Sequence, residues 1–388
     1  MKIGVVGKPS SGKSTFLNAA TLVGAEMASH PFTTIKPNLG TALVRAECPC
    51  KRLGKPCSPK HGKCIEGKRF LPVSLVDVAG LVPGAHEGKG MGNQFLSDLA
   101  DADALIHVVD SSGRTDANGN ATENHDPIED VEFLEKEIEY WMLGIIKKKW
   151  PQLERQVKMN TETVHGFVYK QLSGLKISEE EVKRIVDKKQ LSPSSTEEEL
   201  LEVVREIRKR DKPISIAANK MDLPGSKENY ERMKKLDSVV TPCCAEAELA
   251  LRKAAEEDLI DYIPGSDNFK MLKQMPSKQG KALEFIRTHV LEEYGNTGVQ
   301  ECIEHTIKDL LGMIVVFPVE DEHKLCDKKG SVLPDALLLP EGATPLDLAY
   351  KVHTDIGEKF IGAIDCKTGK RVGKDHCLKD GDIIKILV

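Results

Sequence analysis

The residues best suited to chemistry lie in the glycine-rich segment at residues 7–14, which follows a short apolar stretch at 2–6 and precedes helix-forming residues. Glycines let the backbone curl around phosphate oxygens, so that successive N–H groups and a helix N-terminus point at negative charge. The spacing G-x-x-x-x-G-K-S predicts that Lys13 reaches the β- and γ-phosphates and that the Ser14 hydroxyl ligates Mg²⁺. A glycine turn that binds nothing is disfavoured, because strand, loop and helix all agree. The predicted nucleotide contacts in this loop are Gly7, Lys8, Pro9, Ser10, Ser11, Gly12, Lys13, Ser14 and Thr15.

Two later segments are suited to sensing a γ-phosphate. The loop at residues 31–40 contains Thr34, whose hydroxyl and carbonyl could close over Mg²⁺ and the γ-phosphate and let go after hydrolysis. Asp77 and Gly80 form a D-x-x-G pattern at the end of an apolar stretch, where the carboxylate can hold Mg²⁺ and the glycine N–H can sense phosphate. The glycine-rich residues 81–92 are expected to be mobile, as a second nucleotide switch should be, the first being the loop at 31–40. The predicted Mg²⁺ ligands are Ser14, Thr34 and Asp77, and the predicted catalytic residues are Lys13, Thr34 and Gly80.

The pattern N-K-x-D at residues 219–222 follows an apolar stretch and predicts selection of guanine. Asp222 can accept hydrogen bonds from guanine N1–H and the exocyclic amine, whereas adenine would leave a desolvated carboxylate unpaired. Asn219 is expected to fasten neighbouring loops together, and Lys220 to lie along the base. Further on, Cys244 and Ala245 resemble a serine–alanine loop whose backbone N–H meets guanine O6, with Cys244 in the serine position.

Four cysteines lie in one short loop between two predicted hairpin strands, at residues 41–45 and 70–76. Their spacing, C-x-C-x6-C-x6-C, differs from the paired C-x2-C of ordinary zinc ribbons, so a zinc site is one reading among several. The others are incidental surface cysteines or disulfides. Residues 48–69 also contain seven Lys or Arg and a single acid, Glu66, which indicates either a solvated basic face or contact with an anionic partner. The candidate zinc ligands are Cys48, Cys50, Cys57 and Cys64.

Length and composition limit the class of protein. The 388 residues are enough for two or three domains, and 40% hydrophobic and 30% charged residues are typical of a soluble globular chain. A net charge of -5 argues against the whole chain being a polyanion-binding surface. We expect no signal peptide, because the first apolar stretch begins at residue 2, and no membrane span, because no long apolar run exists.

The remaining chain predicts a helical segment and a small terminal unit. Apolar residues at helical spacing, followed by capping patterns at Ser178 and Thr196, predict helices at about residues 118–212, inserted between two core strands. Amphipathic helices are expected at 246–257, 278–294 and 301–311. The last unit reads β-β-α-β-β, with Thr344 capping a helix that begins at Pro345 and runs to about Ile356. That order suits a ubiquitin-like β-grasp.

Taken together, the segments at residues 7–14, 31–40, 77–80, 84–92 and 219–222 resemble the Obg-like branch of translation-factor GTPases. The resemblance is to the archaeal and eukaryotic members related to YchF, and the last unit resembles a TGS domain. It implies an α/β fold: a P-loop NTPase (Ras-like) GTPase domain with a helical insertion, followed by a β-grasp (TGS) domain. It further implies binding of GTP or GDP with Mg²⁺, and association with ribosomes or RNA.

On this resemblance, residues 1–117 are the first part of the GTPase domain, with the Cys-rich hairpin at 46–69. Residues 118–212 are the insertion, 213–310 complete the GTPase domain with trailing helices, and 311–388 are the TGS domain. Three departures limit what is carried over. Ser10 replaces an asparagine linked in relatives to potassium-stimulated hydrolysis; N-K-x-D is kept, whereas YchF has lost it and prefers ATP; and the wider family lacks the Cys-rich hairpin.

The function expected from these residues is slow, Mg²⁺-dependent GTP hydrolysis that switches binding to a ribosomal or RNA partner. A cytoplasmic monomer without membrane contact is expected. Two alternatives stay open at this point: a nucleotide-gated binding or sensing module in which hydrolysis is incidental, and a metal- or redox-sensing interaction protein that uses the Cys-rich loop.

Overall fold

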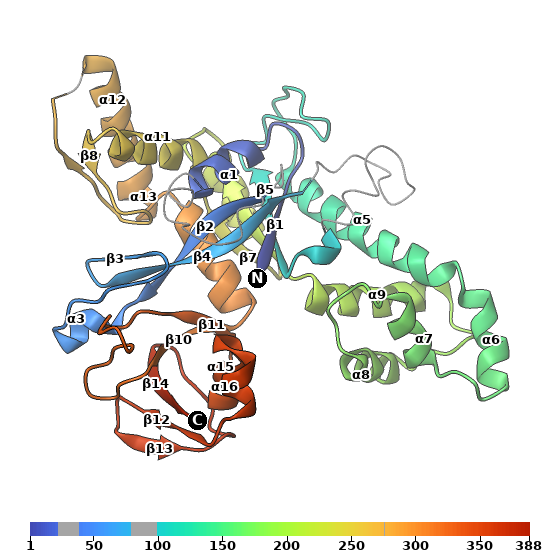
Figure 1. Cartoon of the computed structure of the whole chain (residues 1–388). Helices are drawn as coiled ribbons and strands as arrows, with labels where there is room; N and C mark the ends of the chain where they lie inside the picture. The colour runs from blue at the N-terminus through green and yellow to red at the C-terminus, as the bar shows by residue number, and fades with distance from the viewer. Residues whose placement is uncertain (22–38, 79–98, 275) are drawn as a thin grey trace.

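The computed structural model describes residues 1–21, 39–78, 99–274 and 276–388 (Figure 1). Thr34 and Gly80 lie outside the described residues, as do both predicted switch segments except for the last two residues of the first, 39 and 40. Two large sheets, one two-stranded sheet and a helical arm are the main parts of the described chain. No helix within it has the length and apolar character needed to cross a membrane.

The larger sheet has the strand order β2-β4-β1-β5-β6-β7. β3 pairs with the start of β4, on the side opposite β2. All neighbours along this path are parallel except β2 and β4, which form an antiparallel hairpin. The parallel strands therefore end at one edge, where open α/β sheets place their ligands. The strands are β1 (Lys2–Val6), β2 (Leu39–Glu47), β3 (Lys63–Ile65), β4 (Lys68–Asp77), β5 (Ala104–Asp110), β6 (Ile214–Asn219) and β7 (Val239–Pro242).

Helices cover both faces of this sheet, so its central strands are buried throughout. Strands β5 and β6 have no exposed residue, which explains their continuous apolar composition. One face packs against α1 (Lys13–Thr21), α11 (Ala245–Glu256) and α14 (Val299–His305). α10 (Ser226–Met233) lies between β6 and β7 in the chain. The elements that follow β7 also include β8 (Ile260–Asp261), β9 (Lys270–Met271), α12 (Ser277–Ile286), η2 (Arg287–Leu291), α13 (Glu292–Tyr294) and η3 (Thr306–Leu310).

The predicted helical segment forms the arm seen on the right of Figure 1. The Thr196 side chain accepts the Glu199 N–H while the Glu199 side chain accepts the Thr196 N–H, a complete capping box. Ser178 caps its helix through the Glu181 N–H. Buried leucines and valines from all five helices join one core with β5. The helices are α5 (Pro127–Lys147), α6 (Trp150–Lys158), α7 (Val164–Gln171), α8 (Glu179–Lys189) and α9 (Glu197–Asp211).

The C-terminal unit is a five-stranded sheet in the order β11-β10-β14-β12-β13, with a helix capped by Thr344 as predicted. The prediction of one helix to residue 356 was wrong. His353 is extended (φ -165°, ψ 144°) and its side chain accepts the Asp355 N–H, which ends one helix and starts another. The elements are β10 (Met313–Val319), β11 (Leu337–Pro340), α15 (Pro345–Val352), α16 (Thr354–Glu358), β12 (Gly362–Asp365), β13 (Lys370–Val372) and β14 (Asp382–Leu387).

The β2–β4 hairpin joins the two sheets. It runs from the pair Leu39–Val76 to the pair Glu47–Lys68, and its far end reaches the C-terminal unit (Figure 1). Short α3 (Pro49–Leu53) and β3 lie at that end. Leu71 of the hairpin and Phe317 of the C-terminal unit belong to one hydrophobic core, so the two sheets are packed together through this hairpin.

Candidate functional site

The phosphate loop lies between β1 and α1 in a strained, compact conformation. Ser10 and Gly12 have positive φ angles of 63° and 92°. A Cβ at Gly12 would lie 2.2 Å from the Asn219 Nδ2 atom, so any side chain there would displace Asn219. The Gly12 carbonyl accepts the Phe16 N–H at 2.8 Å and begins α1. The loop therefore presents the N-terminus of α1 at the carboxyl edge of the sheet.

The charged groups predicted for phosphate and Mg²⁺ converge at this edge. Lys13 Nζ contacts the Asp77 carboxylate and donates to the Val78 carbonyl at 3.2 Å. Ser14 is exposed on the first turn of α1. Hydroxyl and carboxylate oxygens are hard ligands of the kind that Mg²⁺ prefers. Ser14 and Asp77 thus fit the predicted ion, while the third predicted ligand, Thr34, lies outside the described residues.

Lys8, also predicted to contact nucleotide, directs its side chain elsewhere. Its ammonium is buried, forms an ion pair with Asp130 at 2.7 Å and donates to the Thr115 carbonyl at 2.6 Å. Asp130 is also bonded to His125 Nε2 at 2.8 Å. Sequence reasoning missed this pair, because nothing in the phosphate-loop pattern indicates a partner on α5. The Lys8 side chain ties the loop to the arm, and only its backbone faces the edge.

Residues 219–222, which are predicted to select the base and are called the base segment below, are attached to the phosphate loop by Asn219 and Lys220. Asn219 Nδ2 donates to the Ser11 carbonyl at 3.0 Å, and its Oδ1 accepts the Ala245 N–H at 3.0 Å. Lys220 Nζ donates to the Ser10 carbonyl at 2.7 Å and to Asp110 Oδ2 at 2.8 Å. These contacts join the segments at the ends of β1, β5, β6 and β7, and the two made by Asn219 are the fastening role expected for it.

Asp110 is a site residue that the sequence analysis did not single out. It ends β5 fully buried, and its carboxylate accepts bonds from Ser112 Oγ at 2.6 Å, Thr115 Oγ1 at 2.7 Å and Lys220. Burial opposes ionisation, but these donors outweigh it and hold the Asp110 pKa below its usual value. An aspartate closing a buried apolar strand was the available signal.

The loop at Cys244 departs in detail from the expected pattern. The Cys244 N–H donates to the Thr297 carbonyl at 2.8 Å and the Ala245 N–H to Asn219, so both amides are already used inside the protein. The expectation that this pair supplies the donor for guanine O6 stays a prediction, and the amides of the first turn of α11 lie next to the pair. Burial, together with the negative charge of the half-buried Asp222 carboxylate, raises the Cys244 pKa.

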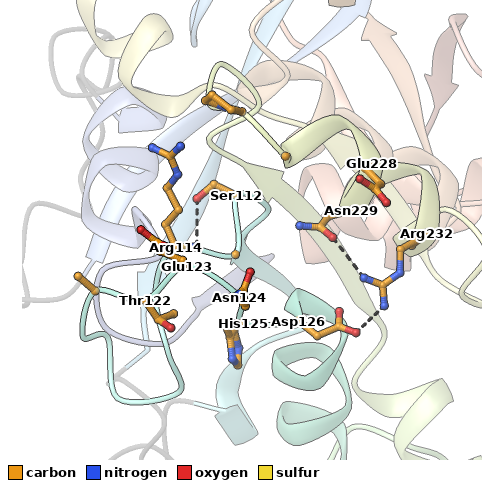
Figure 2. Close-up of a pocket in the computed structure, with 14 residues that line it drawn as sticks. Ser112, Arg114, Thr122, Glu123, Asn124, His125, Asp126, Glu228, Asn229 and Arg232 are labelled. Carbon is orange, nitrogen blue, oxygen red and sulfur yellow. Dashed lines mark hydrogen bonds and ion pairs between the residues drawn. The ribbon is translucent and has the colours of Figure 1, made fainter.

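A polar cavity of about 990 Å³ flanks the base segment (Figure 2). It lies between residues 112–126 and the start of α10, and no residue of the phosphate loop or of 219–222 lines it. Arg232 contacts Asp126 on one side and donates to Asn229 Oδ1 at 3.2 Å on the other. Asn229 in turn donates to the Ser111 carbonyl at 2.9 Å. These contacts support the loop that follows β5 rather than a nucleotide.

The four cysteines of the hairpin converge, as one of the sequence readings required. Their sulfur atoms all lie within 4.8 Å of one another. The Cys48–Cys57 and Cys50–Cys64 sulfurs are 3.9 Å and 3.6 Å apart, and all four are free thiols. The predicted convergence of the four cysteines is confirmed, whereas the choice between metal binding and disulfide chemistry stays a prediction. Burial raises the Cys48 pKa to about 12, whereas hydrogen bonds from the other three sulfurs overcome burial and lower the Cys50 pKa.

The fold and the edge geometry define a P-loop GTPase domain joined to a C-terminal TGS domain. Three family models match the chain: "50S ribosome-binding GTPase" at residues 2–148, "Obg-like GTPase YGR210-like, G4 motif-containing domain" at 217–321, and "TGS domain" at 328–388. The first two account for the larger sheet, and the third for most of the smaller one. β10 precedes the TGS match but pairs within the smaller sheet.

Similar proteins extend over the whole chain. A GTP-binding protein of Methanocaldococcus jannaschii is 51% identical over 99% of this chain and 98% of its own length. The crystal structure of a GTP-binding protein from Pyrococcus horikoshii is 40% identical, covers 100% of this chain and 99% of that one, and has a TM-score of 0.80. A ribosome-binding ATPase, YchF of Buchnera aphidicola, is 28% identical over 100% of this chain and 98% of its own. The chain belongs to the Obg-like GTPase family related to YchF.

Proposed function

We propose that the protein binds GTP with Mg²⁺, hydrolyses it slowly and uses the bound nucleotide to control association with ribosomes. The observation that carries this proposal is the meeting of three segments at one sheet edge. Asn219 bonds both the phosphate loop and the Cys244–Ala245 loop, so phosphate and base contacts are fixed relative to each other. Such a rigid frame is what positions a nucleotide along its whole length.

Each residue has a role in this proposal. Backbone amides of residues 7–14 surround the phosphates, and the Lys13 ammonium neutralises charge on the β- and γ-phosphates. Ser14, Asp77 and Thr34 would hold Mg²⁺, which neutralises developing phosphate charge. Gly80 would sense the γ-phosphate, and Thr34 would release it after hydrolysis. At the other end Lys220 would lie along the base and Asp222 would select it.

The proposed base is guanine, although bacterial relatives are named ATPases. Asp222 is half-buried beside the Cys244 thiol, where an unpaired carboxylate is costly. GTP satisfies it with two donors, and ATP does not. Competition of ATP and GTP against a labelled GTP analogue tests the choice. We expect GTP to displace the label at a concentration roughly a hundredfold lower, and equal displacement would refute the guanine assignment.

Slow hydrolysis is proposed because the residue after D-x-x-G is Leu81. Ras-like enzymes place a water-orienting glutamine there. Leucine has neither donor nor acceptor, so we expect turnover on the order of the unstimulated Ras rate or modestly above it. His86 is the candidate substitute within the chain; like Leu81 it lies outside the described residues. Multiple-turnover phosphate release, with and without ribosomes, separates a switch from a module in which hydrolysis is incidental.

Ribosome association is proposed from the name of the YchF relatives together with the basic hairpin loop. Lys51, Arg52 and Lys55 are exposed and form no ion pair among the described residues, so no carboxylate there neutralises them, although Lys55 donates to the His323 carbonyl at 3.2 Å. The C-terminal unit is too evenly charged to bind RNA strongly by itself. Co-sedimentation with ribosomes in GTP-analogue, GDP and nucleotide-free conditions tests the switch. Association that ignores the nucleotide would refute it. Monomeric state and cytoplasmic location are part of the same proposal.

A further inference from the structure

The four hairpin thiols are spaced as ligands of one metal ion. A tetrahedral zinc–thiolate site, with Zn–S bonds of about 2.3 Å, has sulfur–sulfur edges of about 3.8 Å. The two sulfur pairs here are separated by 3.9 Å and 3.6 Å. A disulfide requires about 2.0 Å, so neither pair is arranged for one. The spacing therefore favours a shared ion over paired cystines.

The ligands come from four different pieces of a short segment. Cys48 follows β2, Cys50 lies in α3, Cys57 in the loop that follows, and Cys64 in β3. A tight turn brings the chain back: Gly62 has φ +72°, and a Cβ there would lie 1.9 Å from the Phe70 carbonyl oxygen. Only glycine fits at that point. The loop is therefore built to return Cys64 to the other three thiols.

A buried cation lies beside the sulfurs without a carboxylate partner in the described residues. Arg69 is 0% exposed, and its guanidinium donates to the Leu333 and Pro334 carbonyls at 2.7 Å and 3.0 Å. Its Nη1 lies 3.9 Å from the Cys57 sulfur. No carboxylate in the described part of the chain pairs with it. An uncompensated buried charge is strongly unfavourable, and four thiolates around one divalent ion carry the net negative charge that would balance it.

The same loop is what docks on the C-terminal unit. Between Cys57 and Cys64, the Ser58 N–H donates to the Val332 carbonyl at 2.8 Å and the Lys60 N–H to the Pro334 carbonyl at 2.9 Å. Lys60 also pairs with Asp327 at 2.9 Å. Both ends of the docked segment are thus candidate metal ligands. Whatever orders the sulfurs also orders this contact.

We propose that Cys48, Cys50, Cys57 and Cys64 bind one Zn²⁺ tetrahedrally and that this ion fastens the hairpin loop to the C-terminal unit. Four protein ligands leave no open position, so the site is structural rather than catalytic. Binding converts thiols to thiolates and releases their protons to solvent. Arg69 compensates the resulting charge. The inference is independent of the nucleotide chemistry.

The first test is metal content. Protein prepared under reducing conditions without added zinc is analysed for bound metals, and metal-free protein is titrated with Zn²⁺ and with Co²⁺ as a spectroscopic probe. We expect one zinc per chain and the spectrum of tetrahedral thiolate-bound cobalt. Cys50→Ser should lose the metal, whereas Cys377→Ser, at an exposed cysteine outside the cluster, should keep it. Iron in place of zinc, two disulfides, or failure of the reduced protein to bind either ion would overturn the proposal.

The second test concerns the fastening and uses the wild-type chain. Hydrogen exchange of the Ser58 and Lys60 amides is compared in zinc-loaded, chelator-treated and zinc-restored protein. We expect removal of zinc to speed both amides by roughly tenfold or more and restoration to reverse it. The chelator-treated protein should still bind a guanine nucleotide, or the amides of the larger sheet should still exchange slowly. Either result shows that the chain has not simply unfolded. Bound zinc with unchanged exchange would overturn the fastening role.

Discussion

Two regions of the molecule each hold several polar groups in one place, but by different contacts. One is the carboxyl edge of the larger sheet, where the nucleotide is proposed to bind, and the other is the cluster of four hairpin thiols. At the edge, protein groups hold one another: Asn219, Lys220 and Asp110 make bonds of 2.7–3.0 Å to each other's loops. In the hairpin, four thiols meet beside a buried arginine that has no carboxylate partner in the described residues. The described groups at the edge are held by bonds to one another, whereas the proposed zinc ion would supply the charge balance in the hairpin. A perturbation should therefore reach one region without the other.

The largest effect is expected for Lys13→Ala. Lys13 is the one loop side chain that can place a full positive charge on the terminal phosphates, so GTP affinity should fall on the order of a hundredfold or more. Equilibrium binding of a fluorescent GTP analogue measures it. Lys136→Ala, at an exposed lysine of α5 that pairs with Glu132 at 3.0 Å, is the matched control. Zinc content should stay unchanged in both variants; loss of metal in Lys13→Ala would show that the two regions are coupled.

The next effect concerns base selection. In Asp222→Asn the side chain can no longer accept both guanine donors, so affinity for GDP should fall by roughly tenfold to a hundredfold. Affinity for ADP, which is weak already, should change little. Calorimetric titration of both nucleotides gives the ratio. Asp237→Asn, at a carboxylate whose side chain is 97% exposed, serves as the control. A parallel loss of both nucleotides would mean that Asp222 supports the loop rather than reading the base.

A third prediction concerns how the free energy of unfolding depends on pH through His107, in the larger sheet. His107 is buried in β5, and burial together with the positive charge of Lys8 lowers its pKa to about 3. Below the ordinary value of 6.5, the unfolded chain binds a proton that the folded chain refuses. Stability should therefore fall with pH between about 6.5 and 3, by up to about 1.4 kcal/mol per pH unit.

Urea unfolding at pH 7 and pH 5 measures this slope. His107→Leu should flatten it, whereas His376→Leu, at an exposed histidine, should leave it as in the wild type. Both measurements are made on metal-free protein, because the thiolates of a zinc-loaded cluster would take up protons on unfolding and add a slope of their own. An equal slope in the two variants would place the acid sensitivity outside β5.

A fourth, smaller effect tests whether the hairpin faces a polyanion. Charge reversal at Lys51, Arg52 and Lys55 should weaken ribosome association and flatten its dependence on salt, because fewer counterions are released. Reversal of Lys183, Arg184 and Lys188 on α8 changes net charge equally and should leave the slope unaltered. Co-sedimentation at several salt concentrations gives both slopes. If the hairpin variant keeps the wild-type slope, the contact is with protein.

The smallest effect is expected for Leu81→Ala. An aliphatic side chain cannot order the attacking water, so its truncation should change the intrinsic hydrolysis rate by less than about threefold. Single-turnover hydrolysis of GTP measures it. His86→Ala is the informative companion: fast turnover by the isolated wild type, abolished by this change, would show that the chain supplies its own water-positioning group.

Sequence reasoning predicted local structure correctly where the pattern is carried by neighbours along the chain, whereas the nucleotide contacts of these segments stay predictions. The phosphate loop, N-K-x-D and the caps at Thr196 and Thr344 are each contained within a few residues. It missed contacts between distant segments, such as Lys8 with Asp130, since neither residue carries a local sign of the other. Arg69 is a further case. The seven basic residues at 48–69 were expected to form an exposed basic face or to contact an anionic partner, yet Arg69 is buried and donates to the carbonyls of residues 333 and 334.

The arm that interrupts the larger sheet has a consequence for how the chain folds. Strands β5 and β6 are paired neighbours, although roughly a hundred residues separate them, and closing so long a loop costs entropy. Helices α5 and α9 shorten that distance, because Arg205 and Arg208 of α9 reach Glu139 and Glu135 of α5 at 3.0–3.1 Å. Local, well-capped helices form early. The arm can thus bring β5 and β6 close to each other before these two strands pair in the sheet.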